Sequence, residues 1–142
     1  PYNSECGATA APDLKSLRTV LSDEELCDVM GPAWKHRQPA ELFSDLLTRS
    51  AGLIGPLDRA DPASFVRRTQ LVQALAYQEI ILGFRRRFPA CAGYTTWEFN
   101  EPWVDLNWGM IDARGLPKQS FWTSRRGCAS AAVAIDRPGY VL

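Results

Sequence analysis

Apolar residues recur at helical spacing over much of the chain. Leu14, Leu17 and Leu21 lie three or four positions apart after Pro12, which fits the first turn of a helix. The same spacing predicts another helix over residues 39–50. The pattern therefore predicts a protein in which helices make up most of the length.

The longest predicted helix runs from Asp61 to Phe88. Asp61 is a favourable N-cap, Pro62 fits the first helical turn, and Pro89 stops the pattern. We expect this helix to have a wide apolar face that is buried. The residues of this face are Phe65, Val66, Val72, Leu75, Ala76, Ile80, Leu82 and Phe84.

A further helix start is marked by local signals alone. Ser22 as N-cap with Glu25 three residues later forms a capping box, which predicts a helix over residues 22–30. Gly31 is a typical helix stop, and residues 31–37 are predicted as a loop.

Two stretches have the composition of short or buried strands. These are residues 1–7 and residues 92–99, the second of which is rich in aromatic and β-branched side chains. A helix over residues 117–126 and a strand over residues 132–136 are predicted to follow. The order of strand, helices, long helix and strand is typical of an α/β fold in which helices connect parallel strands.

The stretch from Ala92 to Trp108 concentrates aromatic and acidic residues. It breaks at Pro102, which has no backbone N–H to continue a sheet ladder. Aromatic faces beside polar groups suit a sugar, whose C–H face stacks on an indole while its hydroxyl groups form hydrogen bonds. The alternative is a core strand closed by an aromatic plug, since aromatic residues more often serve as core. The residues concerned are Trp97, Trp103, Trp108, Glu98, Glu101 and Asp105.

Composition and charge narrow the classes of function. The chain has 142 residues, the size of one domain, and 16 basic against 16 acidic side chains. We therefore expect no nucleic-acid surface and no membrane binding, and no apolar run is long enough for a transmembrane helix. The basic cluster at residues 85–87 falls at a predicted helix end, where solvated cations complement the helix dipole.

The cysteines and the single histidine do not indicate a metal site. The four cysteines are widely spaced without a C-x-x-C pair, so we expect neither a structural zinc site nor a disulfide framework, and no cofactor. The first residues, Pro1 to Glu5, resemble neither a signal peptide nor a natural initiation sequence, so we expect a piece of a longer protein. The sequence leaves the cellular location open, with the cytoplasm as the default expectation.

Four stretches, in order along the chain, match motifs of one enzyme family. SECGATAAPDLKSLR (residues 4–18) resembles a nucleophile segment with the pattern Ser-Glu-Phe-Gly followed by a helix start. RFPACAGYTTWEFNEPWVDLNWGMIDARGLPKQSFW (residues 87–122) resembles a last barrel strand with the pattern Trp-Gln-Leu-Asn-Asp-x-Trp and, further on, Gly-x-x-Lys. Residues 34–36 and SFVRRTQLVQALA (residues 64–76) resemble a Trp/His loop and a Phe-x-x-x-Ser-Gln helix. The combination resembles glycoside hydrolase family 2, in its β-mannosidase-like branch.

This resemblance implies a fold and a division of the chain. The fold would be α/β, a helix-rich fragment of a TIM (β/α)8 barrel in which residues 1–6 and 92–99 form the last two strands. Active sites of such barrels lie at the C-terminal ends of the strands. Residues 1–127 would be the C-terminal portion of the catalytic domain, and residues 128–142 the start of a following linker or β-domain.

The same resemblance implies the residues of the site. Glu5 falls on the position of the catalytic nucleophile and Trp97 on the aromatic floor of the sugar pocket. Asn100 and Trp103 fall on the adjoining rim and would also bind substrate. The acid/base glutamate of the family lies on the fourth strand, which would precede Pro1.

Some positions depart from the family pattern or invite another interpretation. Cys6 stands where Phe or Tyr is usual, Glu98 where Gln is usual, and Glu101 where Asp or Asn is usual, which leaves the sugar specificity open. The tripeptide from Asn100 also looks like the acid/base signature of related barrel families, but there it precedes the nucleophile. We therefore interpret Glu101 as a rim or structural acid. His36 could contact substrate from its loop, although a lone histidine is more often structural.

The resemblance thus implies a fragment of a retaining, exo-acting glycoside hydrolase that cleaves terminal β-linked sugars. A carbohydrate would be its partner, and the exposed sheet edges of the fragment could support a homo-oligomer. One alternative is a non-catalytic carbohydrate-binding module that keeps Trp97 and Trp103. Another is an interaction domain built on the long helix of residues 61–88, which would bind no glycan.

Overall fold

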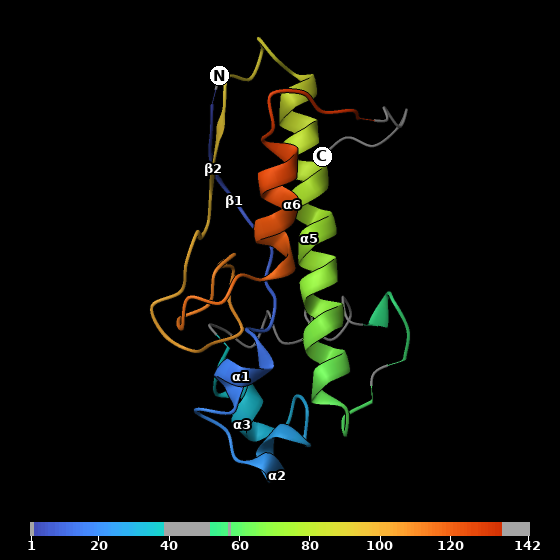
Figure 1. The fold of residues 1–142 in the computed structure, drawn as a ribbon, viewed down its shortest axis with the longest axis vertical. Helices are drawn as coiled ribbons and strands as arrows, with labels where there is room; N and C mark the ends of the chain where they lie inside the picture. Colours follow the sequence, from blue (N-terminus) through green and yellow to red (C-terminus); the bar gives the residue numbers. More distant parts are fainter. Residues whose placement is uncertain (1, 39–51, 57, 135–142) are drawn as a thin grey trace.

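The computed structural model describes residues 2–38, 52–56 and 58–134. The helix predicted over residues 39–50 lies outside these ranges. With the labels of Figure 1, the elements in chain order are β1 (Asn3–Cys6), α1 (Leu14–Leu17), α2 (Asp23–Leu26), α3 (Pro32–Lys35), α5 (Pro62–Arg86), β2 (Tyr94–Thr96) and α6 (Gln119–Gly127).

The two strands lie side by side although they are far apart in sequence. They pair in parallel, with Asn3 opposite Tyr94 and Cys6 opposite Thr96, and the register shifts between these pairs. α5 and α6 pack against each other beside the strands (Figure 1). The predicted α/β arrangement is confirmed, but both strands are shorter than predicted, and residues 132–134 form no strand.

α5 confirms the prediction of one long helix. The Asp61 side chain caps it by accepting a hydrogen bond from the Ser64 amide at 2.8 Å, and Pro62 is its first residue. The helix ends at Arg86, shortly before Pro89. Both ends were predictable because caps and proline act through the local backbone.

The buried face of α5 is more polar than the sequence predicted. Leu75 is 51% exposed, whereas Thr69, Gln70 and Gln73 are buried. These polar side chains face neighbouring loops and form hydrogen bonds with them. The hydrogen bonds offset the free-energy cost of burying polar groups. The complete buried set is Phe65, Val66, Thr69, Gln70, Gln73, Ala74, Tyr77, Ile81 and Gly83.

The capping box of α2 is confirmed, but the helix is shorter than predicted. Ser22 Oγ accepts a hydrogen bond from the Glu25 amide, and the Glu25 carboxylate accepts one from the Ser22 amide. Four residues after Glu25, the Val29 amide donates to the Arg59 carbonyl oxygen at 3.0 Å instead of continuing the helix. Met30 then adopts a left-handed φ of 63°.

The segment after Gly31, predicted as a loop, contains α3, so that prediction was wrong. Pro32 occupies its first turn, and Trp34 is fully buried. The Trp34 ring packs edge-on against Phe65 of α5 with centroids 5.3 Å apart, and its Nε1 donates to the Glu25 carbonyl oxygen at 2.9 Å. A single helical turn is too short to show apolar periodicity, and the tertiary burial of the indole stabilises it.

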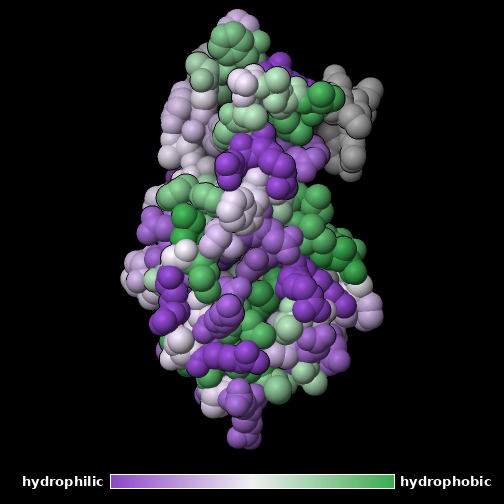
Figure 2. Space-filling view, in the orientation of Figure 1, coloured by the Kyte–Doolittle hydropathy of each residue, from purple (hydrophilic) through white to green (hydrophobic). Residues whose placement is uncertain are grey.

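The apolar core lies between the short helices, the first turns of α5 and the aromatic stretch. Burial of these side chains supplies the main driving force for folding. On the face shown in Figure 2, apolar and polar residues are interspersed rather than gathered in one patch. The buried members of the core are Ala11, Leu17, Leu21, Leu26, Val29, Met30, Trp34, Phe65, Val66 and Leu106.

α6 and α5 approach closely near the end of α6. A Cβ at Gly127 would lie 2.9 Å from Cγ2 of Ile81, so glycine allows this packing. Arg85 donates to the carbonyl oxygens of Gly127 and Ala129 at 2.6 and 2.5 Å. The prediction of a solvated cation at the end of its own helix is therefore wrong for Arg85. This side chain binds the end of the neighbouring helix, where cations also complement the dipole.

Candidate active-site edge

The carboxyl ends of β1 and β2 meet at one edge of the sheet. Glu5 lies near the end of β1, and Trp97 directly follows β2. The Trp97 amide donates to the Cys6 carbonyl oxygen at 2.7 Å. A Cβ at Gly7 would lie only 2.0 Å from the Trp97 carbonyl oxygen, so glycine is needed for this approach. The structure therefore brings Glu5 and Trp97 to the same edge, as predicted.

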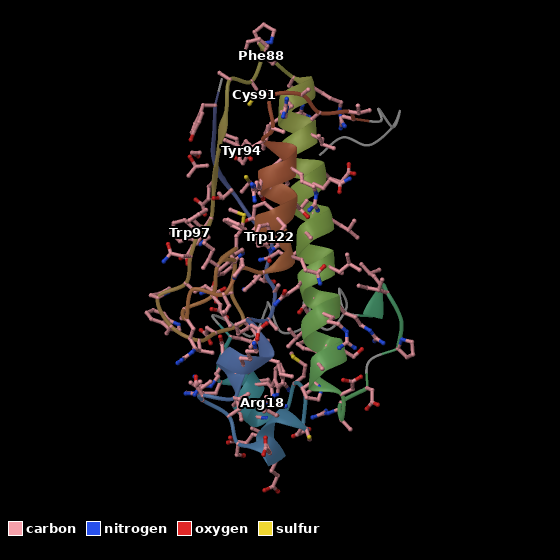
Figure 3. The ribbon with its side chains drawn as sticks, in the orientation of Figure 1. Arg18, Phe88, Cys91, Tyr94, Trp97 and Trp122 are labelled. Atoms are coloured by element: carbon pink, nitrogen blue, oxygen red, sulfur yellow. The ribbon has the colours of Figure 1, made fainter. Side chains whose placement is uncertain are left out.

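The helices occupy one face of the strand pair. Tyr94 stacks on Phe84 of α5 with ring centroids 5.6 Å apart, and it lies between β2 and the helices in Figure 3. Cys6 is close enough to Tyr77 of α5 to contribute to the raised pKa of that tyrosine, whose main cause is burial. Glu5 is exposed, whereas Cys6 at the end of the same strand is partly buried.

The predicted sugar-binding residues are open to solvent. Trp97 is 49% exposed and Trp103 62% exposed, and Asn100 and Glu5 are also exposed. The Trp103 Nε1 donates to Oδ2 of Asp105 at 3.0 Å, which orients the indole within its own loop. Exposed aromatic rings, a carboxylate and an amide are the kinds of group that a sugar ring needs for stacking and hydrogen bonding.

The aromatic stretch is held from one side by the residues that follow α3. The Leu106 amide donates to the Arg37 carbonyl oxygen at 2.9 Å. Burial raises the pKa of Asp105, while the Trp103 indole, Arg37 and His36 act in the opposite direction. The exposed His36 therefore lies near the aromatic stretch, within electrostatic range of Asp105.

Glu101 is buried, and it forms an ion pair that the sequence did not predict. Its Oε1 lies 2.5 Å from Nζ of Lys118, and neither side chain has exposed surface. Burial raises the pKa of Glu101 to about 7 against the opposing effect of Lys118, and burial lowers the pKa of Lys118. These contacts favour the structural interpretation of Glu101. The Gly-x-x-Lys motif that ends at Lys118 could have pointed to this lysine, but the motif by itself does not indicate a partner for it.

Gln73 of α5 is a second buried residue that sequence reasoning missed. Its Nε2 donates to the carbonyl oxygens of Ala8 at 2.7 Å and Trp108 at 3.2 Å. Its Oε1 accepts a hydrogen bond from Ser120 Oγ at 2.7 Å. One amide thus links α5 and α6 to the segment after β1 and to the end of the aromatic stretch.

Asp112 is another buried polar residue that links separate segments of the chain. It accepts hydrogen bonds from Ser16 Oγ at 2.6 Å and from the backbone amides of Asp13, Arg114 and Leu116 at 3.2, 2.9 and 3.0 Å. Four donors compensate for the burial of this carboxylate. Asp112 therefore fastens α1 to the turn that precedes α6.

Three further findings on the described residues concern metal ions, membrane spans and a cavity away from the site. Within residues 2–38, 52–56 and 58–134, no cluster of His, Cys, Asp and Glu side chains is arranged to hold a metal ion. In the same ranges, no helix has the length and apolarity to cross a membrane. A cavity of about 540 Å³ lies at the other end of β2, lined by residues that include Phe84, Phe88 and Tyr94.

Curated relatives cover nearly the whole of this chain. No family model matches it. The β-mannosidase B of Aspergillus niger and that of Aspergillus terreus are each 25% identical to it over 148 residues, which is 96% of this chain and 16% of the relative. The chain therefore spans about a sixth of the length of these relatives.

Solved structures show the same fold. The β-D-mannosidase from Dictyoglomus thermophilum matches 87% of this chain and 15% of its own with a TM-score of 0.80 at 21% identity. An exo-chitosanase from Amycolatopsis orientalis matches 89% of this chain and 16% of its own with a TM-score of 0.66 at 26% identity. The chain is thus a helix-rich α/β structure of the kind found in TIM-barrel glycoside hydrolases. More particularly, these relatives confirm the resemblance to β-mannosidase-like enzymes of glycoside hydrolase family 2.

Proposed function

We propose that this chain is the C-terminal part of the catalytic barrel of a retaining, exo-acting glycoside hydrolase that cleaves terminal β-linked sugars. Residues 1–127 would supply the last two barrel strands, and residues 128–142 would begin a following linker or β-domain. The observation that carries the proposal is the parallel pairing of β1 and β2. It brings Glu5 and Trp97 to the carboxyl edge of the sheet, where barrel enzymes hold their active sites.

In this proposal Glu5 is the nucleophile. Its carboxylate attacks the anomeric carbon while the bond to the leaving oxygen breaks, which gives a covalent glycosyl-enzyme. A second carboxylic acid, contributed from outside this chain, protonates the leaving oxygen and then removes a proton from the water that releases the sugar. Retention of configuration requires the two carboxyl groups to stand about 5–5.5 Å apart.

Trp97, Asn100 and Trp103 are proposed to bind the sugar. The exposed indole of Trp97 offers an apolar face to the C–H groups of a pyranose, and the Asn100 amide can bond its hydroxyl groups. The names of the relatives point to a β-mannoside as the first substrate to test. A β-glucosaminide is the second, because one related structure is an exo-chitosanase complex with a nitrophenyl β-D-glucosamine.

Covalent labelling of the complete protein tests this proposal. A 2-fluoro-mannosyl fluoride reacts with the nucleophile, and its fluorine slows hydrolysis of the intermediate by destabilising the positively charged transition state. We expect peptide mass mapping to find the sugar on Glu5, and to find it again on Glu5 in a Glu98→Gln control. A label on another carboxylate, or the same label in Glu5→Gln, would show that Glu5 is not the nucleophile.

The chain of 142 residues on its own is expected to hydrolyse no chromogenic β-mannoside. The proposed acid/base lies outside it, and two strands cannot close a barrel. Its open sheet edges are expected to cause self-association. Turnover that Glu5→Gln abolishes would refute the first expectation, and a monodisperse monomer by light scattering would contradict the second.

A non-catalytic carbohydrate-binding module is the second candidate. The observation in its favour is the exposure of Trp97 and Trp103, which suits stacking whether or not chemistry follows. The two candidates differ in one result. The binding module would be supported if the complete protein binds mannose with measurable affinity but neither hydrolyses a chromogenic β-mannoside nor accepts the fluorosugar label.

A further inference from the structure

The ammonium group of Lys118 connects the two halves of the proposed site. Lys118 is fully buried, and its Nζ has three acceptors, which matches its three N–H donors. These acceptors are Oε1 of Glu101 at 2.5 Å, the carbonyl oxygen of Ala10 at 2.9 Å and that of Asn107 at 3.2 Å. Ala10 belongs to the segment that follows the strand of Glu5, and the other two acceptors belong to the aromatic stretch.

The same cation holds both ends of the loop that carries Trp103. Glu101 precedes the exposed indole by two residues and Asn107 follows it by four, so Lys118 closes residues 101–107 into a loop. The loop contains no helix or strand of its own. Packing reinforces the closure, because a Cβ at Gly109 would lie 2.5 Å from Cγ of Glu101.

A buried ion pair of this kind contributes more to geometry than to stability. The cost of removing two charges from water offsets much of their attraction, so an uncharged pair of similar shape is often equally stable. What the pair does supply is a single arrangement of the groups it joins, since a displaced partner would leave a buried charge unsatisfied. This reasoning applies directly to Glu101 and Lys118, neither of which has exposed surface.

We propose that the Glu101–Lys118 ion pair is a positioning device that sets the aromatic rim, with Asn100 and Trp103, relative to the strand of Glu5. Its consequence for sugar binding rests on the function proposed above. Asn100 and Trp103 flank Glu101 in sequence, so a shift of the Glu101 side chain moves both. Neither Glu101 nor Lys118 would touch the sugar, because both are buried.

The test compares Glu101→Gln and the uncharged double variant Glu101→Gln/Lys118→Met with the complete wild-type protein. Rim residues bind ground state and transition state alike, so their displacement raises KM and leaves kcat nearly unchanged. We expect KM for a nitrophenyl β-mannoside to rise about tenfold or more in the double variant, which corresponds to about 1.4 kcal/mol. Ser16→Ala is the matched control, because it removes a buried hydrogen bond to Asp112 and leaves both partners of the Glu101–Lys118 ion pair in place.

Hydrogen exchange supplies a readout that does not depend on glycosidase activity. Amides of residues 103–107 are expected to exchange about tenfold faster in both variants, while those in the middle of α5 exchange as in wild type. If the wild-type protein hydrolyses no glycoside, the proposed function fails but the exchange data still decide the positioning role. Folded variants with unchanged KM and unchanged rim exchange would overturn the inference, and so would the same changes in Ser16→Ala.

Discussion

A Glu5→Gln variant of the complete protein is expected to lose about 10⁴-fold or more in kcat for an aryl β-mannoside. An amide cannot form the glycosyl-enzyme, and removal of a nucleophile that acts together with other catalytic groups costs rates of this order. KM or the affinity for mannose is expected to change little, because Trp97, Asn100 and Trp103 remain. Steady-state kinetics with a nitrophenyl β-mannoside measure both quantities.

Two further variants make this result specific. Glu24→Gln removes an exposed carboxylate from α2 and is expected to retain wild-type kinetics. Glu5→Ala with added azide is expected to regain turnover, since azide can attack the anomeric carbon from the side of the missing carboxylate and release the aryl group. The product would be a glycosyl azide of inverted configuration. An azide product of retained configuration would identify Glu5 as the acid/base instead, and kcat within tenfold of wild type in Glu5→Gln would end the proposal.

Replacing Trp34 with alanine is expected to lower the free energy of unfolding by about 3–5 kcal/mol. The indole is fully buried, packs against Phe65, and donates to the Glu25 carbonyl oxygen, so its loss leaves a cavity and removes one hydrogen bond. A typical domain has a stability of about 5–15 kcal/mol, so this change alone brings a protein near its folding limit. Urea unfolding followed by circular dichroism measures the difference.

Trp103→Ala is the matched control for this loss of stability. It removes an indole of the same size that is 62% exposed and forms its side-chain hydrogen bond with Asp105, two residues away. We expect it to change the free energy of unfolding by about 0.5 kcal/mol or less, as is usual for exposed positions. Equal destabilisation by Trp34→Ala and Trp103→Ala would show that α3 and its indole do not anchor the core.

Local signals predicted those parts of the fold that depend on neighbours in sequence. Asp61 and Pro62 marked the start of α5, Ser22 and Glu25 the capping box of α2, because each acts on backbone groups within one turn. The aromatic and β-branched residues before Trp97 marked β2 for the same reason. Where a long-range contact decides the outcome, the local pattern is wrong: it predicts a loop where α3 forms and a longer helix than α2.

The candidate site divides in a similar way. Glu5, Trp97, Asn100 and Trp103 could be named from motifs, because a nucleophile segment and an aromatic rim have recognisable residue types. The structure agrees with the prediction that Glu5 and Trp97 come from adjacent parallel strands whose carboxyl ends meet. The roles that the resemblance implies for these residues stay predictions. The fluorosugar label and the kinetics of Glu5→Gln test them.

By itself, the amino-acid sequence determined the long helix α5, the places of the two strands that pair, and the residues that resemble a glycosidase site. Only the tertiary structure decided that Thr69 and Gln73 face inward, that Glu101 is buried, and that Lys118 is its partner. A side chain's type shows what it can bind, but a polar side chain becomes buried only when distant segments supply its hydrogen bonds. Those segments meet only when the whole chain is folded.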